Sequence, residues 1–368
     1  MRPWVLLVAV VACDGGSSPA APSACPGAQA LWTGSDYSSS AVGSLAASGA
    51  VTSVVGRVDL GADPALSASA GRAFYVARDQ DAIFELDACG NPEQRFSAHV
   101  SSPSGGGSDP SGVAVASDGS LWVPLFLVPS VLVLAPDGGV SRTIDLSRYD
   151  SDGNPDASSI TIVRTPAGEK AFVTLDRLDP YPQSVQPSWM LRIDTASGQV
   201  EDTIVLAGRN PFTVTQDGST LWLADPGNFD DATEPQAGVE RFDTSTSTTA
   251  LLVREAQLGG SVAQIAVIGS CGSAIVAGAT TVNATSLVTF DASTGAPIRA
   301  SAQSPLTTPG FDLEGLSWVD DALLLGDRRR AASGYPVHAF GASAACGLAP
   351  RPDAIFLPSP PVTLLPVP

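Results

Sequence analysis

The sequence has 368 residues, of which 44% are hydrophobic and 15% are charged. This composition can supply a core and excludes wholesale disorder, and the length suits one large domain or two ordinary ones. The net charge of −18 opposes binding to phosphate backbones, so we expect no nucleic-acid partner. The 36 glycines and 30 prolines indicate many short elements joined by turns rather than long helices.

The first residues of the chain predict export. Arg2 precedes an apolar run at residues 4–11, which is too short to span a bilayer as a helix. The sequence VVAC, ending at Cys13, resembles the lipobox of bacterial lipoproteins. This resemblance implies a signal peptide at residues 1–12 and a lipidated Cys13, followed by a flexible linker at residues 13–27. A secretory signal with a coincidental cysteine is the alternative.

From about residue 30, a unit of four short β-rich runs recurs about every 50 residues. The clearest run of each unit starts at Ala30, Ala73, Leu121, Ala171, Leu221, Ala274 and Ala322. Turn sequences of the D-x-x-T-G kind follow most of the next runs, as in residues 291–295. Seven such units predict a β-propeller, because a four-stranded blade can bury both faces only between neighbours. A two-sheet sandwich is the alternative, but it does not require a fixed period.

The units resemble the YVTN/NHL-type propellers of bacterial envelope proteins. Their blades carry an Asp-Gly turn before one strand and a D-x-x-T-G sequence after another, as in SDGSLWV at residues 117–123 and FDASTG at residues 290–295. The predicted fold is therefore an all-β, single seven-bladed propeller of four-stranded antiparallel blades over residues 28–368. We expect a monomer, with residues 354–365 completing the first blade and closing the ring.

The blade geometry assigns loops to two faces. Loops that join strands two and three of a blade, and loops between blades, form what we call the upper face; the other loops form the lower face. The four cysteines after Cys13 all fall on the lower face: Cys25, Cys89, Cys271 and Cys346. They include no CxxC motif, and an even number in an exported protein favours disulfides over a zinc site. Because each pair is offset by one blade, we predict Cys25–Cys89 and Cys271–Cys346.

An acidic or amide residue recurs at the upper-face start of the inner strands. The residues are Asp63, Asp109, Asp156, Asn210 and Asp312. One interpretation is that their side chains close turns through hydrogen bonds to the backbone. The other is a ring of binding groups around the mouth of the central channel.

The long loops of the upper face supply further candidates for binding. Asp176, Asp225 and Arg328 each begin or lie in such a loop. In one loop, Asp150, Asp152, Asn154 and Asp156 present oxygen atoms at alternating positions, a pattern that suits Ca²⁺ or another divalent cation. The bidentate glutamate and flanking helices of an EF-hand are missing, so a solvated acidic turn is the alternative.

One short motif bears on catalysis. The sequence EGLSW, which starts at Glu314, resembles the opening of a strand in gluconolactonase-type propellers, where the glutamate binds a divalent metal. The resemblance implies a metal-dependent hydrolase, with Glu314 as a ligand and Asp156 and Asn210 as positional candidates. It covers three matching residues, and the remaining ligands of that family have no clear match.

No nucleophile-elbow, zinc-protease or dinucleotide-binding motif is present in the sequence, and its two histidines, His99 and His338, lie in unrelated segments. We therefore expect a lipid-anchored propeller of the bacterial cell envelope that faces the periplasm or the cell surface. Its acidic upper-face loops would bind an envelope protein or a small ligand without catalysis. Enzymatic activity is left open, with the metal-dependent hydrolase as the alternative.

Overall fold

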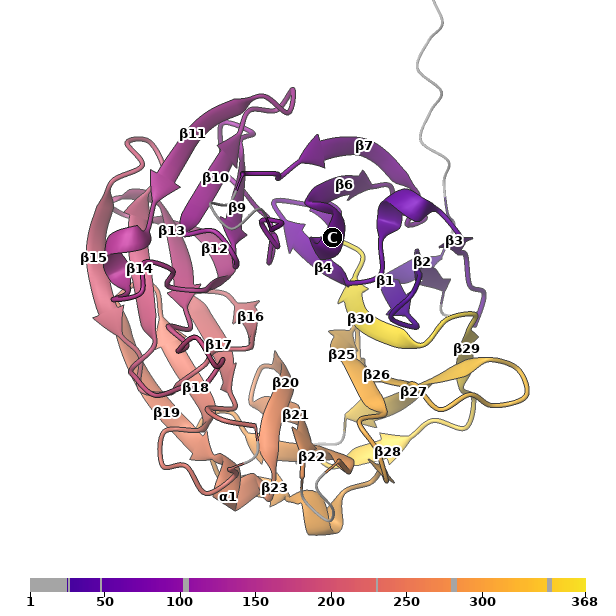
Figure 1. The fold of residues 1–368 in the computed structure, drawn as a ribbon. Helices are drawn as coiled ribbons and strands as arrows, with labels where there is room; N and C mark the ends of the chain where they lie inside the picture. Colours follow the sequence, from indigo (N-terminus) through magenta and orange to yellow (C-terminus); the bar gives the residue numbers. More distant parts are fainter. Residues whose placement is uncertain are drawn as a thin grey trace, which may run out of the picture.

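The computed structural model describes residues 25, 27–46, 48–101, 106–229, 231–278, 283–342 and 346–368. The predicted signal peptide and Cys13 lie outside these residues. Within them, the strands form seven antiparallel sheets arranged around a central axis (Figure 1), so the predicted seven-bladed propeller is confirmed. No helix in this part of the chain is long and apolar enough to cross a membrane.

Each blade runs from an inner strand at the axis to an outer strand at the rim. The inner strands are β30 (Pro361–Pro366), β4 (Pro64–Ser69), β8 (Ala114–Val115), β12 (Ala157–Thr165), β16 (Thr213–Asp217), β20 (Ser261–Ile268) and β25 (Leu313–Val319). The second strands are β1 (Ala28–Ser35), β5 (Arg72–Ala77), β9 (Leu121–Leu125), β13 (Gly168–Leu175), β17 (Thr220–Asp225), β21 (Cys271–Ala277) and β26 (Ala322–Asp327).

The third and fourth strands complete the blades. The third strands are β2 (Ser40–Ala46), β6 (Ala82–Leu86), β10 (Ser130–Leu134), β14 (Trp189–Asp194), β18 (Gly238–Asp243), β22 (Thr285–Asp291) and β27 (Tyr335–Ala342). The fourth are β3 (Val54–Val55), β7 (Pro92–Ser97), β11 (Val140–Asp145), β15 (Val200–Val205), β19 (Thr248–Arg254), β23 (Pro297–Arg299) and β28 (Leu348–Pro350). Two short strands, β24 (Thr307–Thr308) and β29 (Ile355–Leu357), add to β22 and β27. The one α-helix of the described chain is α1 (Glu255–Leu258), and 3₁₀ turns occur at Val58–Leu60, Arg78–Gln80, Ser147–Tyr149 and Ser301–Gln303.

The core of the protein lies between blades. Second and third strands such as β9 and β10 are buried along their whole length, because each face of a blade packs against a neighbouring blade. A separate apolar cluster fills each junction; between blades two and three, for example, Phe74 and Phe96 pack with Leu132. This arrangement explains why the strands read as continuous apolar runs rather than as alternating ones.

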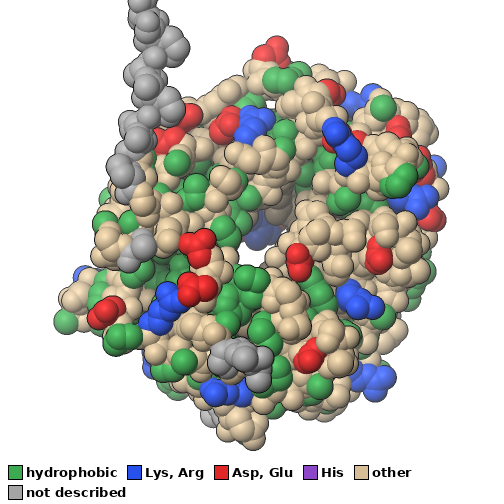
Figure 2. Space-filling model, turned by 180° about the vertical axis from the view of Figure 1, so that it is seen from behind, with side chains coloured by type: hydrophobic (Ala, Val, Ile, Leu, Met, Phe, Trp, Pro, Cys, Tyr) green, Lys and Arg blue, Asp and Glu red, His purple; other side chains and the backbone are tan. Residues whose placement is uncertain are grey.

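Polar side chains on the inner strands link successive blades. Ser67 Oγ accepts the backbone N–H of Val113 at 3.1 Å, and Ser69 Oγ accepts that of Val115 at 2.9 Å. Gln264 Oε1 plays the same part at the junction of blades six and seven, where it accepts the N–H groups of Gly315 and Leu316. The inner strands therefore form a hydrogen-bonded wall around a central opening, which the space-filling view shows as a hollow (Figure 2).

The C-terminal segment closes the ring, as predicted. Strand β30 pairs antiparallel with β1, from Ala30 opposite Pro366 to Gly34 opposite Pro361. It thereby supplies the inner strand of blade one, whose other strands come from the N-terminal part of the propeller (Figure 1). Leu364 of β30 is 3% exposed and lies in the apolar cluster between blades seven and one.

Both predicted disulfides are confirmed. Cys25 bonds to Cys89 and Cys271 bonds to Cys346, with Cα–Cα distances of 5.3 and 5.2 Å. The first bridge joins the start of blade one to blade two, and the second joins blade six to blade seven. Both lie at the lower face, as the blade geometry predicts.

Candidate functional site

The acidic and amide residues at the start of the inner strands do close turns. Asp109, Asp156 and Asn210 have φ angles of 51, 54 and 57°, in the left-handed region that Asp and Asn tolerate better than other side chains. The carbonyl groups of Asp109 and Asp156 each accept the N–H of the residue that follows the second strand of the same blade, at 2.9 and 3.1 Å. The side chains of Asp156 and Asn210 also bond to the backbone, at Leu178 and Gly227, which supports the turn-closing interpretation for these two; the Asp109 side chain pairs with Arg78 instead.

In blades two and three, an arginine neutralises these carboxylates. Arg78 donates to both oxygens of Asp109, at 2.8 and 3.1 Å, and lies 3.7 Å from a carboxylate oxygen of Asp63. Burial raises the pKa of Asp63, and Arg78 opposes this effect. The three side chains form an internally paired cluster with one net negative charge.

In blade seven, Glu314 has an arginine partner. Arg328 Nη1 lies 2.6 Å from Glu314 Oε2 and also donates to the carbonyl group of Pro361, while Nη2 donates to that of Ser35. The guanidinium group stacks 4.7 Å from the ring centre of Tyr37. Burial raises the pKa of Glu314, and the charge of Arg328 opposes the rise. Arg328 thus ties together blade seven, blade one and the closing strand.

Replacing Arg328 with alanine is expected to lower the free energy of unfolding by about 2 kcal/mol, because Glu314 would keep a half-buried charge without its partner. Urea unfolding at pH 7 measures this loss. The double variant Arg328→Ala/Glu314→Gln should recover part of it, since the unpaired carboxylate is then gone. A single variant as stable as the wild type would show that the pair contributes nothing.

The predicted Ca²⁺ loop is held by hydrogen bonds within itself and by contacts with the loop that follows β13. Asp150 accepts the amide of Gln186 at 2.6 Å and lies 3.3 Å from Arg177, while Asp152 accepts the backbone N–H of Asn154 at 2.8 Å. The Asn154 amide donates to Asp156 at 2.9 Å. Burial raises the pKa of Asp156 to about 7, with Asp152 and Asp150 adding to the effect.

Among the described residues, no three His, Cys, Asp or Glu side chains meet at distances that would hold a metal ion. The structure keeps the four residues of this loop together, but it does not bring Glu314 to them, and it pairs Glu314 with Arg328 instead. Divalent-cation binding therefore stays a prediction.

Blades four and five contain four buried acids that form no ion pair with any arginine, lysine or histidine of the described residues. Asp176, Asp225, Glu240 and Glu255 are all at most 3% exposed. Burial raises the pKa of Asp176 and of Asp225 well above the ordinary value, and it raises that of Glu255 to about 8. Asp176 has one hydroxyl donor, Ser158, at 2.5 Å.

Exposed aromatic side chains gather on the upper-face loops. They are Tyr37, Tyr181, Phe212, Phe229 and Phe311, which are between 40% and 81% exposed. Phe212 and Phe229 pack edge to face at 5.2 Å, and the loop of Phe229 contacts the loop of Tyr181 through a hydrogen bond from the Ser184 N–H to Asn228. The upper face of blades four and five therefore presents aromatic rings beside the acidic loops.

Two sets of these residues were missed from the sequence. In the segment GVERFD, Glu240 lies two residues before Phe242, so both side chains point to the same buried face of the strand. The alternation of a strand could therefore have predicted that Glu240 is buried. Glu255 lies in α1, which the repeat pattern does not predict. The exposure of Phe212 and Phe229 depends on loop conformation, for which the sequence carries no periodic signal.

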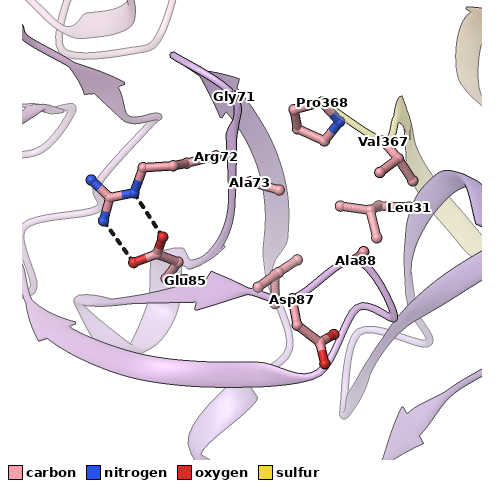
Figure 3. A pocket seen from close by; sticks show the side chains of 10 residues that line it. Leu31, Gly71, Arg72, Ala73, Glu85, Asp87, Ala88, Val367 and Pro368 are labelled. Atoms are coloured by element: carbon pink, nitrogen blue, oxygen red, sulfur yellow. Dashed lines mark hydrogen bonds and ion pairs between the residues drawn. The ribbon is translucent and has the colours of Figure 1, made fainter. Parts of the chain in front are cut away.

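Two surface pockets lie at the lower face. One, of about 130 Å³, lies between blades one and two at the lower face, where Leu31 and Val367 meet Ala73 and Ala88 (Figure 3). Its charged lining is self-paired, since Arg72 donates to both oxygens of Glu85 at 2.7 and 2.6 Å. Asp87, which also lines it, accepts the backbone N–H groups of Cys89 and Asn91 at 2.8 Å.

The sequence matches no family model and no curated protein. Among solved structures, a protein from Lactobacillus plantarum is similar, with 14% identity, a TM-score of 0.56, and coverage of 92% of this chain and 99% of that one. A putative 6-phosphogluconolactonase from Bacteroides fragilis has 14% identity and a TM-score of 0.54, covering 94% and 99%. What these two structures share with the present chain is the fold. A catalytically inactive virginiamycin B lyase from Staphylococcus aureus, solved with quinupristin, has 13% identity and a TM-score of 0.52, covering 82% and 93%.

Proposed function

We propose that the protein is a lipid-anchored propeller of the bacterial cell envelope, of the YVTN/NHL type, that binds a basic polypeptide on its upper face without catalysis. The observation that carries this proposal is the placement of its exposed aromatic rings. Five of them lie on upper-face loops, among acidic side chains. Exposed aromatic residues are characteristic of recognition surfaces, and an acidic surrounding selects a cationic partner.

The charge of the upper face supports a basic partner. Three of its arginines are paired with the protein's own acids: Arg78 with Asp109, Arg209 with Glu234, and Arg328 with Glu314. Asp179 and Asp231, in the loops of blades four and five, accept only hydrogen bonds from their own loops and form no ion pair with a described residue. Arginine suits such a surface best, because its planar guanidinium group both stacks on aromatic rings and pairs with carboxylates.

The contacts of Glu314 favour binding over the hydrolase alternative. A glutamate that serves as a metal ligand needs free oxygen atoms, whereas Glu314 Oε2 is 2.6 Å from the Arg328 guanidinium group. The arginine is itself held by two backbone carbonyl groups and by Tyr37. Turning it away would break contacts that also close the ring.

The proposed place of the protein rests on the lipobox-like sequence at Cys13 and on the two disulfides. Disulfides persist in oxidising compartments outside the cytoplasm. A lipid anchor at Cys13 would hold the ring at a membrane surface through a short linker, leaving the upper-face loops to contact a partner.

Peptide binding tests the proposed function. Short peptides of alternating arginine and alanine are expected to bind the chain from residue 14 onward about fivefold more tightly than the matching lysine peptides, and glutamate peptides should not bind. The double variant Phe212→Ala/Phe229→Ala should weaken arginine-peptide binding about tenfold and abolish the preference over lysine. Fluorescence anisotropy at physiological salt measures each affinity.

The matched control is Ile268→Ala/Ile298→Ala, which removes two side chains of similar exposure from the lower face. This control should bind the arginine peptide as the wild type does. Equal affinity for arginine and lysine peptides, unchanged by the phenylalanine substitutions, would show that only general electrostatic attraction is at work and would contradict the proposal.

A further inference from the structure

Two fully buried carboxyl groups face each other between blades four and five. Asp225 is the last residue of β17 and Glu240 lies on the neighbouring strand β18; both are 0% exposed. Gly208 lies against both side chains: its N–H donates to Glu240 at 2.5 Å, and a Cβ atom on it would lie 2.1 Å from an oxygen of Asp225. Two buried carboxylates that contact the same residue repel each other strongly if both are charged, so a proton or a cation must compensate one of the charges.

The hydrogen-bond donors around the pair are distributed unequally. Glu240 accepts the backbone N–H of Ala207 at 3.2 Å, the N–H of Gly208 at 2.5 Å, and the hydroxyl group of Thr249. Neither oxygen of Asp225 receives an N–H or O–H from any described residue. The donors stabilise a negative charge on Glu240, whereas nothing stabilises one on Asp225.

The other charged groups that face Asp225 are also acidic. Asp176 approaches from the end of β13 in blade four, and Glu255 lies on α1, which follows β19 of blade five. In the described part of the chain, no arginine, lysine or histidine forms an ion pair with Asp225 or Glu240. The backbone N–H groups of Ala207 and Gly208 point at the oxygens of Glu240, and their partial positive charge disfavours a cation bound to this carboxylate. The bound species that fits these contacts is a proton.

We infer that Asp225 and Glu240 hold a single proton between them, with Asp225 as the carboxylic acid that donates and Glu240 as the carboxylate that accepts. Asp225 then donates a hydrogen bond to Glu240. The pair keeps one negative charge, on Glu240, which the N–H groups of Ala207 and Gly208 and the hydroxyl group of Thr249 stabilise. Burial raises the pKa of Asp225 well above its ordinary value and raises that of Glu240.

This proton holds the two loops that carry the aromatic pair. A Cβ atom at Gly208 would lie 2.1 Å from the Asp225 carboxyl group, so the loop before Phe212 packs directly on the acid. The same loop bonds to the loop of Phe229, since Asn210 donates to Gly227 at 2.8 Å and Arg209 donates to Gln236 at 3.0 Å. Loss of the proton would place two like charges beneath both loops. This consequence for binding rests on the proposed function, whereas the shared proton does not.

The pH dependence follows from the direction of the shifts. An acid whose pKa is higher in the folded than in the unfolded chain stabilises the fold at low pH, and that contribution is lost as pH rises through the folded-state pKa. Asparagine at position 225 offers the same hydrogen bond to Glu240 at every pH. The full-length variant Asp225→Asn should therefore melt within about 1 °C of the wild type at pH 5 and at least about 3 °C above it at pH 8.5.

Two further variants make the test specific. Glu240→Gln should lower the melting temperature at both pH values, because its amide group would face the N–H groups of Ala207 and Gly208. Asp327 is the matched control, because it ends the second strand of blade seven as Asp225 does in blade five. Burial opposes its ionisation, but hydrogen bonds from His338 and Arg329 hold the pKa of Asp327 well below its ordinary value. Asp327→Asn should therefore lower the melting temperature at pH 8.5.

Hydrogen exchange shows where the proton acts. In the wild type, the backbone amides of residues 206–212 and 226–229 should lose protection between pH 5 and pH 8.5, so that their exchange rates rise more than the intrinsic rates do. Asp225→Asn should abolish this loss of protection. A melting temperature that falls in Asp225→Asn at both pH values, together with a rise in the wild type on adding Ca²⁺, Mg²⁺ or K⁺, would show a bound cation and overturn the inference. These measurements need no peptide, so their outcome is independent of the test of the proposed function.

Discussion

A chain that ends at Leu357 is expected to lose its cooperative unfolding transition. Strand β30 is the inner strand of blade one, pairs with β1 over residues 30–34, and places Leu364 in the core between blades seven and one. Without it, the edge of β1 is unpaired and both neighbouring blades lose apolar contacts. The loss should exceed about 5 kcal/mol, which is comparable to the total stability of many proteins. Circular dichroism during heating and urea unfolding measure it.

Adding the missing strand as a peptide supplies the control. The peptide PSPPVTLLPVP, which is residues 358–368, should restore the transition at high micromolar concentration, because β30 is held by noncovalent contacts. The same peptide with Leu364→Asp should not. A truncated chain that unfolds cooperatively at the wild-type midpoint would show that the ring does not depend on this strand.

Removal of the Cys271–Cys346 bridge is expected to cost about 4 kcal/mol. The bridge spans 75 residues, and a crosslink over a loop of this length removes considerable entropy from the unfolded chain. The double variant Cys271→Ala/Cys346→Ala avoids leaving a free thiol, and its urea midpoint should fall accordingly. Cys13→Ser is the control, because it removes a cysteine that is not part of either bridge. An unchanged midpoint would mean that unfolded-state entropy is not what the bridge limits.

The fold could be predicted because the sequence repeats its local signals. Turn residues recur at a constant period, and a four-stranded unit that cannot bury both faces alone requires neighbours on each side. The blade positions then place Cys25 near Cys89 and Cys271 near Cys346, and they leave blade one with a missing strand, which was predicted within residues 354–365 and is β30 at residues 361–366. These conclusions depend on position within the blade rather than on any particular side-chain contact.

The charged contacts of the upper face could not be predicted in the same way. Asp109 and Glu314 were correctly placed at this face, but their partners Arg78 and Arg328 lie at the ends of other strands. Whether a carboxylate there is free, paired with arginine or opposed by another acid depends on loop conformation, which has no period. The approach of Asp225 to Glu240 is the clearest case: Asp225 lies opposite Gly238, and Glu240 lies two residues further along the same strand.

The position of the Cys25–Cys89 bridge has a mechanical consequence. Tension applied to the segment before Cys25 is shared between β1 and blade two, because the covalent bond carries part of the load to Cys89. Strand β1, which pairs with the noncovalently held β30, thus bears only part of a pull that would otherwise detach it from the sheet. The ring is therefore expected to withstand shear at its N-terminal attachment while the bridge is oxidised, and to unzip from the junction of blades seven and one once it is reduced.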